Sequence, residues 1–221
     1  MAKKFKEVAL IRELLKERIL IIDGAMGTQL QAKEIPQSAW EGKEGCNELL
    51  NRTAPDIIRS IHEAYAKADA DIIKTNTFGA MPWVLEEYDL ASEAYDLTKR
   101  GCQLVKEVCE EYSSPEKPRF CACSLGPGTK LPSLNHIDYD EMYEGYTQCA
   151  KGAKAGGADI FLLETCQDPL QIKAAIHACQ DVAPQIPIMV SVTIEQTGTM
   201  LIGTDAATIA TILEPFDILS H

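Results

Sequence analysis

The sequence has no run of about 18 apolar residues, the length that a helix needs to span a bilayer. It is also poor in positive charge, because 21 lysines and arginines stand against 33 aspartates and glutamates, a net charge of −12. Nucleic acids and anionic membrane surfaces attract basic proteins, so neither is an expected partner. Residues 1–17 carry charges every three or four positions, which predicts an amphipathic helix rather than a secretory signal. We therefore expect a cytoplasmic protein.

The eight cysteines include no C-x-x-C pair, the spacing that is typical of zinc ribbons and redox sites. Several lie within helical patterns. Cys102 and Cys109 share one expected helix face, and Cys149 and Cys179 stand among alanines. A free cysteine in such a setting behaves as a small hydrophobic residue. We expect most of the eight to be buried thiols rather than metal ligands or disulfides.

A dinucleotide-binding fingerprint, G-x-G-x-x-G, is also missing after the first apolar run. Short runs rich in Ile, Val, Leu or Phe predict six strands, at 19–23, 72–76, 120–125, 160–164, 188–193 and 216–220. Helical patterns separate these runs, and this alternation predicts a parallel α/β fold. Without the fingerprint, a (β/α)8 barrel is favoured over a doubly wound sheet.

Four predicted helices begin at residues that commonly cap a first turn. Thr53 precedes a stretch with Pro55 in its first turn, and Asp138, Asp168 and Thr204 precede three further helical stretches. A complete barrel has eight strand–helix units, whereas about six can be traced here. We therefore expect an incomplete barrel, with residues 1–221 forming its N-terminal part as one domain.

Polar residues follow the strands at the points where a parallel barrel places its active site. Asp23 ends the first predicted strand and Glu164 ends the fourth, and both carboxylates suit a ligand ammonium group. The tight turn from Gly24 to Gly27 lets backbone N–H groups approach a ligand, which suits a carboxylate. Together these features predict a receptor for an amino acid.

Simpler roles exist for both acids. Asp23 is also suited to bond within its own turn, and Glu164 to pair with a neighbouring cation such as Lys74. A glycosidase uses two carboxylates as well, but it usually stacks aromatic residues on sugar rings, and aromatics make up only 6% of this chain. The four histidines show no metal-ligand spacing.

The sequence resembles the homocysteine S-methyltransferase family along essentially its whole length. The motifs that carry the resemblance are IIDGAMGTQL at 21–30, NELLN at 47–51, PDII at 55–58, ADIIKTNTFGA at 70–80, SLGP at 124–127 and DIFLLET at 159–165. The stretch PIMVSVTI at 187–194 is most similar to the N-terminal homocysteine-binding module of the cobalamin-dependent branch, the methionine synthases.

The resemblance implies a (β/α)8 TIM barrel that binds homocysteine at its mouth and transfers a methyl group to the zinc-held thiolate, forming methionine. The residues that it assigns to substrate binding are Asp23, Gly24, Ala25, Met26, Gly27, Asn76, Thr77 and Glu164. The two acids would hold the amino group, the glycine turn would lie near the carboxylate, and Asn76 and Thr77 would line the mouth. Cobalamin would carry the methyl group, and cobalamin- and folate-binding modules of the same parent protein are further partners.

The zinc ligands of the family are three cysteines, one in a Gly-x-Asn-Cys motif and two in a Gly-Gly-Cys-Cys motif. Neither motif occurs in this chain, so we assign it no catalytic or metal-binding residue and expect it to be inactive alone. The favoured hypothesis is a fragment of a zinc-dependent methyltransferase. One alternative is a non-catalytic binding or assembly module that needs a second chain, and another is a truncated product without function.

Overall fold

A computed structural model describes residues 2–219, and of residues 2–9 only the helical backbone. The strands are β1 (Ile72–Lys74), β2 (Phe120–Leu125), β3 (Ile160–Cys166) and β4 (Ile188–Val192). The α-helices are α1 (Ala2–Glu17), α2 (Gly27–Gln31), α3 (Leu50–Thr53), α4 (Pro55–Lys67), α5 (Pro82–Leu85), α6 (Ala94–Tyr112), α7 (Tyr139–Gly156), α8 (Pro169–Val182) and α9 (Ala206–Leu213). Short 3-10 helices span Gln37–Trp40, Asn47–Leu49, Glu86–Tyr88, Ala91–Glu93 and Pro132–Leu134. None of the described helices is long and apolar enough to cross a membrane.

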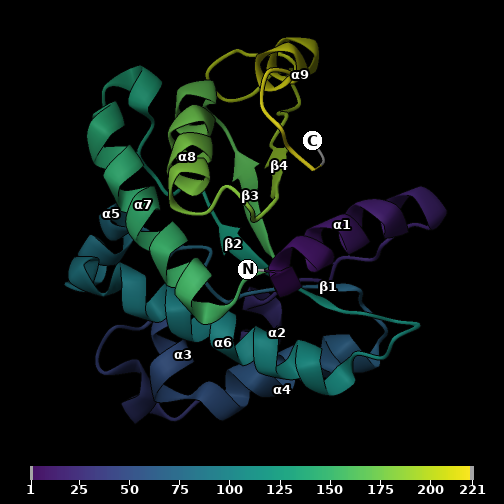
Figure 1. The fold of residues 1–221 in the computed structure, drawn as a ribbon. Helices are drawn as coiled ribbons and strands as arrows, with labels where there is room; N and C mark the ends of the chain where they lie inside the picture. The colour runs from purple at the N-terminus through teal and green to yellow at the C-terminus, as the bar shows by residue number, and fades with distance from the viewer. Residues whose placement is uncertain (1, 220–221) are drawn as a thin grey trace.

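The four strands form one parallel sheet in the order β1-β2-β3-β4 (Figure 1). Ile72 pairs with Phe120, Ala122 with Ile160, and Phe161 with Ile188, so each strand pairs with the next one along the chain. Helices lie between successive strands, which confirms the parallel α/β fold. The strands are short and apolar because both faces of the sheet are covered.

The two outermost predicted strands are not formed as predicted. Along 19–23, only Ile22 pairs as a single parallel bridge with Ile72, although the Asp23 N–H donates to the Ile72 carbonyl at 2.9 Å. At the other edge, the described part of 216–220 contains no strand, and the Leu219 N–H donates to the Ile188 carbonyl at 2.6 Å. Residue 220 lies outside the described chain. Each segment has a partner on one side only, so its strand hydrogen bonding stays incomplete.

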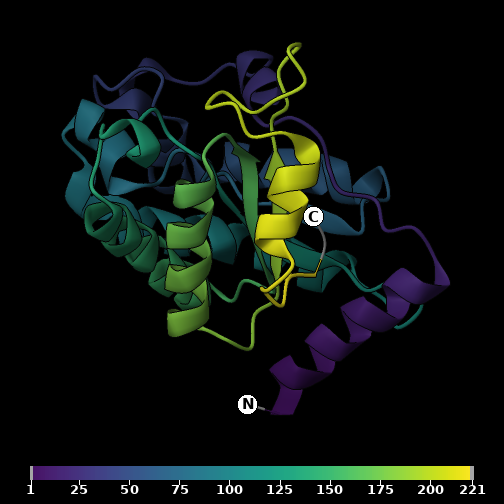
Figure 2. The same cartoon turned by 90° about the horizontal axis from the view of Figure 1, so that it is seen from above.

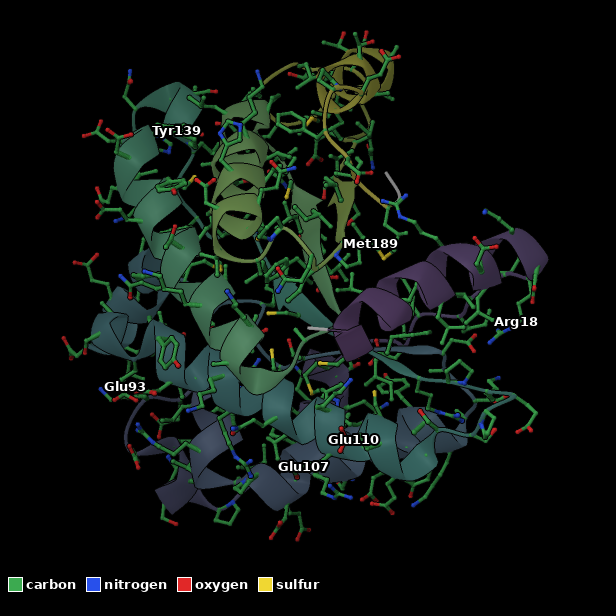
Figure 3. All side chains as sticks on the ribbon, in the orientation of Figure 1. Arg18, Glu93, Glu107, Glu110, Tyr139 and Met189 are labelled. Carbon is green, nitrogen blue, oxygen red and sulfur yellow. The ribbon has the colours of Figure 1, made fainter. Side chains whose placement is uncertain are left out.

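One face of the sheet is covered by α1, on the side opposite α6, α7 and α8 (Figures 1 and 2). The apolar residues of this face are Ile72, Phe120, Ala122, Ile160 and Leu162, and they pack with the fully buried Ile11 of α1. Met189 of β4 also lies on this side (Figure 3). These residues fill the half of the face nearest the amino ends of the strands, and the polar residues of the face lie nearer the carboxyl ends.

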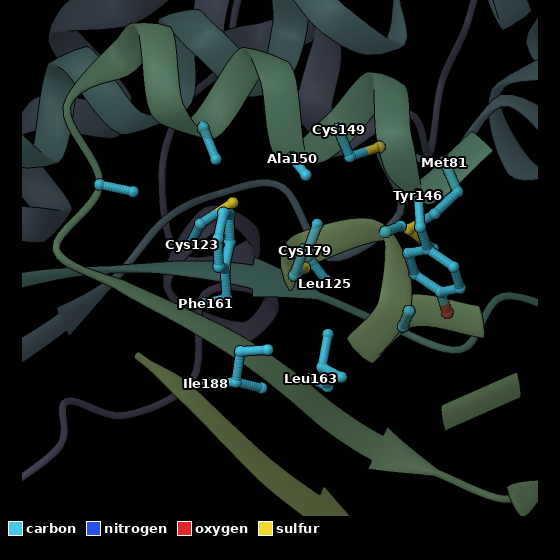
Figure 4. Close-up of a cluster of buried hydrophobic side chains, with 14 of the residues drawn as sticks. Met81, Cys123, Leu125, Tyr146, Cys149, Ala150, Phe161, Leu163, Cys179 and Ile188 are labelled. Carbon is cyan, nitrogen blue, oxygen red and sulfur yellow. The ribbon is translucent and has the colours of Figure 1, made fainter. Parts of the chain in front are cut away.

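The other face of the sheet packs against α6, α7 and α8. Strand alternation directs Cys123 and Leu125 of β2, and Phe161 and Leu163 of β3, towards these helices (Figure 4). Buried thiols were predicted for most of the eight cysteines; all eight are buried and free, and several of them fill this layer. Because the layer holds most of the buried apolar side chains, it is the main core and fixes the sheet from which the site is built.

Two predicted helix starts agree closely with the structure. Asp168 caps α8, because its Oδ1 accepts a hydrogen bond of 2.8 Å from the Leu170 N–H. The fourth helix starts one residue later than predicted. Asp205 rather than Thr204 is its cap, and the Thr208 N–H donates to the Asp205 carboxylate at 2.7 Å.

The other two predicted caps do not act as caps through their side chains. Thr53 is the last residue of α3, where its hydroxyl donates to the Leu49 carbonyl at 3.2 Å, and Ala54 precedes α4 instead. Asp138 stands at the start of α7 but makes no capping hydrogen bond. The prediction for Thr53 was wrong because a short helix that no pattern marked directly precedes α4.

Candidate functional site

A cleft of about 350 Å³ opens at the carboxyl ends of β1, β2 and β3. The residues that line it are Asp23, Gly24, Met26, Gly27, Asn47, Glu48, Lys74, Thr75, Asn76, Phe78, Ser124 and Glu164. Six of the eight predicted binding residues therefore line this cleft, and Ala25 and Thr77 do not. The cleft lies above the apolar half of the face that α1 covers, so its floor is closed by packed side chains.

Asp23 is an acid of this cleft with one carboxyl oxygen that accepts no hydrogen bond from the described residues. Its backbone is held beside β1, and its Oδ1 is buried without a hydrogen-bond partner among the described residues. Burial raises the pKa of Asp23 to about 7, against the lowering effects of a hydrogen bond from the Lys74 backbone and of the Lys74 charge, and with a smaller raising effect from Glu164. Near neutral pH this carboxyl group is therefore partly protonated.

Glu164 projects from β3 into the same cleft and already has partners. Its Oε2 lies 3.3 Å from the Lys74 Nζ, and its Oε1 accepts a hydrogen bond from the Ser124 hydroxyl. The pairing with Lys74 that the sequence offered as the simpler role of Glu164 is thus present. The paired carboxylate of Glu164 and the unpaired Oδ1 of Asp23 therefore lie in the same cleft.

A bulge in β3 separates Glu164 from the nearby Cys166. The register with β4 shifts between Leu163 and Cys166, and Thr165 adopts a left-handed conformation with φ of 58°. In a regular strand, Cys166 would share a face with Glu164, but here it packs into the helix-facing core. Burial raises the pKa of the Cys166 thiol to about 12, so this cysteine is neither in the cleft nor a thiolate at neutral pH.

The turn after Asp23 offers backbone donors. Within the described structure, no backbone carbonyl accepts from the N–H groups between Gly24 and Gln29, whereas the Leu30 N–H is bonded inside the following helix. A Cβ at Gly24 would lie 2.8 Å from the Tyr65 hydroxyl, so a larger residue at this position would displace the Tyr65 side chain. The same hydroxyl donates to the Ala25 carbonyl at 2.8 Å, which ties Ala25 to α4 rather than to the cleft.

Asn76 and Thr77 follow β1 but separate from each other. Asn76 lines the cleft while its amide donates to the Asn47 carbonyl at 2.7 Å and to the Asn51 Oδ1 at 3.1 Å. Thr77 is fully buried, and its hydroxyl donates to the Ser124 carbonyl at 2.7 Å. The prediction that Thr77 lines the mouth is therefore not supported, because its side chain points into the packed layer behind the site.

Sequence reasoning missed Glu48 as a lining residue. This acid is only 8% exposed, it accepts a hydrogen bond of 2.7 Å from the Gly79 N–H, and burial raises its pKa. It comes from a 3-10 helix rather than from a strand end, so no pattern marked it. Lys74, Thr75, Phe78 and Ser124 lie at or just after strand ends, where the sequence pattern also places them, although no binding role was assigned to them.

No three His, Cys, Asp or Glu side chains of residues 10–219 are grouped as a metal site would require. The cysteines do not offer one either, because all are buried and burial raises the pKa of Cys149, for example, to about 12. A zinc site built on thiolates therefore does not fit the described residues.

A family model described as homocysteine S-methyltransferase matches residues 20–220. The chain belongs to the homocysteine S-methyltransferase family. It is 43% identical over 210 residues to methionine synthase from Mycobacterium tuberculosis, and 44% identical over 210 residues to methionine synthase from Mycobacterium leprae. Both matches cover 93% of this chain, which spans only 18% and 17% of the length of these two relatives.

The fold of this homocysteine S-methyltransferase family member is similar to that of solved structures. The homocysteine methyltransferase MmuM from Escherichia coli, in its metallated form, matches with a TM-score of 0.76 at 20% identity, over 95% of this chain and 75% of the other. The apo form of MmuM matches with a TM-score of 0.69 over 93% of this chain and 72% of the other. The parallel sheet and its helices are thus arranged as in MmuM.

Proposed function

We propose that this chain is the N-terminal part of a homocysteine-binding domain, and that its cleft binds the amino-acid portion of homocysteine. In this proposal the domain is a TIM barrel, of which residues 1–221 supply about six strand–helix units. The intact protein would be a methionine synthase or a related methyltransferase, acting in the cytoplasm and forming methionine. Membership of the family and the 93% coverage by methionine synthases support this proposal.

The unpaired carboxylate oxygen of Asp23 is the observation on which the proposal depends. A buried acceptor without a partner costs free energy, about 1–3 kcal/mol for a neutral group and more for a charged one. Such a cost is offset when a ligand supplies the donor. An ammonium group in the cleft would meet Asp23 Oδ1 and, close by, Glu164, and it would favour the ionised form of Asp23.

The remaining contacts follow from the positions of the ligand groups. The backbone N–H groups of the turn from Gly24 to Gln29, which have no backbone acceptor in the described structure, would receive the ligand carboxylate. Asn76 would lie beside the ligand, with its amide donors held by Asn47 and Asn51. Because the pKa of Asp23 is about 7, binding near neutral pH would release a fraction of a proton.

Activation of the thiol and the methyl transfer itself are not assigned to residues of this chain. The described residues do not fit a zinc site. In the proposed parent protein, zinc ligands and cobalamin- and folate-binding modules would be supplied by other regions. The chain spans less than a fifth of the two methionine synthases, which leaves room for them.

Titration of the chain with L-homocysteine, followed by NMR and calorimetry, tests the proposal. We expect weak, saturable binding with a Kd on the order of 1 mM, because the ligand is small. Asp23→Asn should abolish binding, and Glu144→Gln, which removes an exposed acid from the outer side of α7, should not change it. Calorimetry at pH 7 in buffers of different ionisation enthalpy should detect the released proton.

The analogue 4-sulfanylbutanoate, which lacks the amino group, separates amino-acid recognition from general binding. It should bind more weakly than homocysteine and should release no proton from Asp23. Equal binding of the two compounds, or undiminished binding of homocysteine to Asp23→Asn, would contradict the proposed role of the acids. No detectable binding by a folded chain would contradict the proposal as a whole.

A further inference from the structure

Lys74 is the cation in the wall of the cleft, and its position connects the two acids. It ends β1, while Glu164 lies on β3, two strands away in the sheet. Its Nζ reaches across to within 3.3 Å of the Glu164 Oε2, while its backbone N–H bonds to the Asp23 side chain. The side chains of Lys74 and Glu164 are 24% and 15% exposed, so their pair is partly desolvated.

In this pair, the Lys74 ammonium occupies the Glu164 oxygen that the ammonium group of a ligand would use. Of the two Glu164 oxygens, Oε1 receives the Ser124 hydroxyl and Oε2 faces the Lys74 ammonium. The head group of Lys74 is a compact ammonium, and the amino group of an amino acid is also an ammonium that would bind the same oxygen. In the ligand-free protein, the Lys74 side chain therefore stands where the ligand would make the same contact.

Lys74 is also able to leave this position. Its head group is carried on a flexible four-carbon stem, and the described contacts of the Nζ are with Glu164 alone. The backbone of Lys74 stays fixed in β1 and against Asp23 when the stem rotates. Movement of one side chain thus exposes Glu164 without disturbing the sheet.

We propose that Lys74 is a specificity-determining residue that competes with the amino group of the ligand for Glu164. Binding of an amino acid displaces the Lys74 ammonium from Glu164, and the ligand amino group then bridges Glu164 and Asp23. The cost of opening the pair lowers the affinity for every ligand with an amino group and leaves ligands without one unaffected. The inference rests on the proposed function, because it assumes that the cleft binds an amino acid.

Substitution of Lys74 tests the competition directly. Lys74→Met keeps the length of the side chain and removes its charge, Lys74→Gln is a second neutral variant, and Lys74→Arg retains the ion pair. At pH 8, Asp23 is mostly ionised in the unsubstituted chain, and loss of the Lys74 charge raises its pKa and reduces part of the gain. Lys74→Met and Lys74→Gln should still bind L-homocysteine about fivefold more tightly than the unsubstituted chain at this pH. Lys74→Arg keeps a cation beside Glu164 and should not gain this affinity.

Two controls restrict the effect to the amino group and to this lysine. Affinity for 4-sulfanylbutanoate should be the same in Lys74→Met and in the unsubstituted chain. Lys151→Met, which removes an exposed lysine from α7, should leave homocysteine affinity unchanged. In the unsubstituted chain, the Lys74 side-chain NMR signal, assigned from its loss in Lys74→Met, should shift on addition of homocysteine and not of the analogue.

The outcomes distinguish this inference from the function on which it rests. If the unsubstituted chain binds homocysteine and the two neutral variants bind it equally or more weakly, Lys74 does not compete and only the inference is overturned. A Lys74 signal that does not shift when homocysteine binds would overturn the inference in the same way. If neither the unsubstituted chain nor any folded variant binds homocysteine, the proposed function is overturned and the inference with it.

Discussion

The two ends of the sheet carry buried acids in opposite electrostatic states. At the amino ends of the strands, Asp71 lies 2.7 Å from the Arg18 guanidinium and accepts the Ile21 N–H at 2.8 Å. Asp159 lies 2.7 Å from the Lys106 ammonium and accepts the Cys121 N–H at 2.9 Å. At the carboxyl ends, Asp23 keeps a buried oxygen without a partner among the described residues.

The pKa values follow this difference in partners. Burial acts to raise the pKa of Asp71, but hydrogen bonds from Arg18 and the Ile21 N–H outweigh it and hold the pKa below its ordinary value. Burial prevails at Asp23 and raises the pKa to about 7. The comparison teaches that a buried acid stabilises the fold where its oxygens have donors, and indicates a ligand site where a cleft leaves one of them free.

The same substitution at the two ends should have opposite effects, and the largest is expected at Asp71. Asp71→Asn leaves Arg18 without its charged partner and should lower the free energy of unfolding by about 3 kcal/mol. Urea unfolding at pH 7 measures the change. A variant as stable as the unsubstituted chain would show that the amino-end ion pair contributes nothing net, and the contrast between the two ends would fail.

Asp23→Asn should instead make the chain less sensitive to rising pH. Because the folded pKa of Asp23 is raised, the stability contributed by its protonated form is complete below about pH 4 and is lost as the pH rises through about 7. Relative to the variant, the unsubstituted chain should lose about 3 kcal/mol between pH 5 and pH 8. Parallel pH profiles of urea unfolding for the two proteins would contradict the raised pKa.

His62 sharpens the comparison because it has unpartnered polar atoms but lines no described cleft. It is fully buried in α4, neither ring nitrogen has a hydrogen-bond partner among the described residues, and burial lowers its pKa to about 3. Its contribution to stability is present above about pH 6.5 and is lost as the pH falls. We regard it as a core residue rather than a ligand site.

The unsubstituted chain should therefore lose about 2 kcal/mol between pH 7 and pH 5 relative to His62→Leu. Urea unfolding at the two pH values measures this difference, and contributions from other groups cancel between the proteins. A His62→Leu variant with an unchanged pH profile would mean that the imidazole has the same pKa in the folded and the unfolded chain. Such a result would show that burial does not lower the pKa of His62.

Much of the fold was predictable from local patterns. All four strands were predicted within about two residues of their bounds, because each is a short, largely apolar run. The two edge segments were not, since pairing at an edge depends on what lies beside the chain rather than on the residues in it. Thr53 failed as a cap for a similar reason, because α3 occupies the place before α4.

The site was predictable where it follows the strand ends and not elsewhere. Asp23 and Glu164 were found because they directly follow apolar runs and end at one edge of a parallel sheet. Glu48 was missed because tertiary packing of a 3-10 helix brings it to the cleft. Thr77 was placed in the mouth because the sequence does not reveal on which side of the loop after β1 a residue points.

The left-handed residue in β3 has a consequence for how the strand distributes its chemistry. Before Thr165 the strand alternates strictly between its two sides, and after it the parity is inverted, with the Thr165 N–H anchored on the Ser191 hydroxyl at 3.1 Å. The left-handed conformation of Thr165 thus places the side chains of Glu164 and Cys166 on opposite sides of the sheet. The Glu164 carboxylate lies in the cleft, and the Cys166 thiol lies in the packed layer on the other side of the sheet.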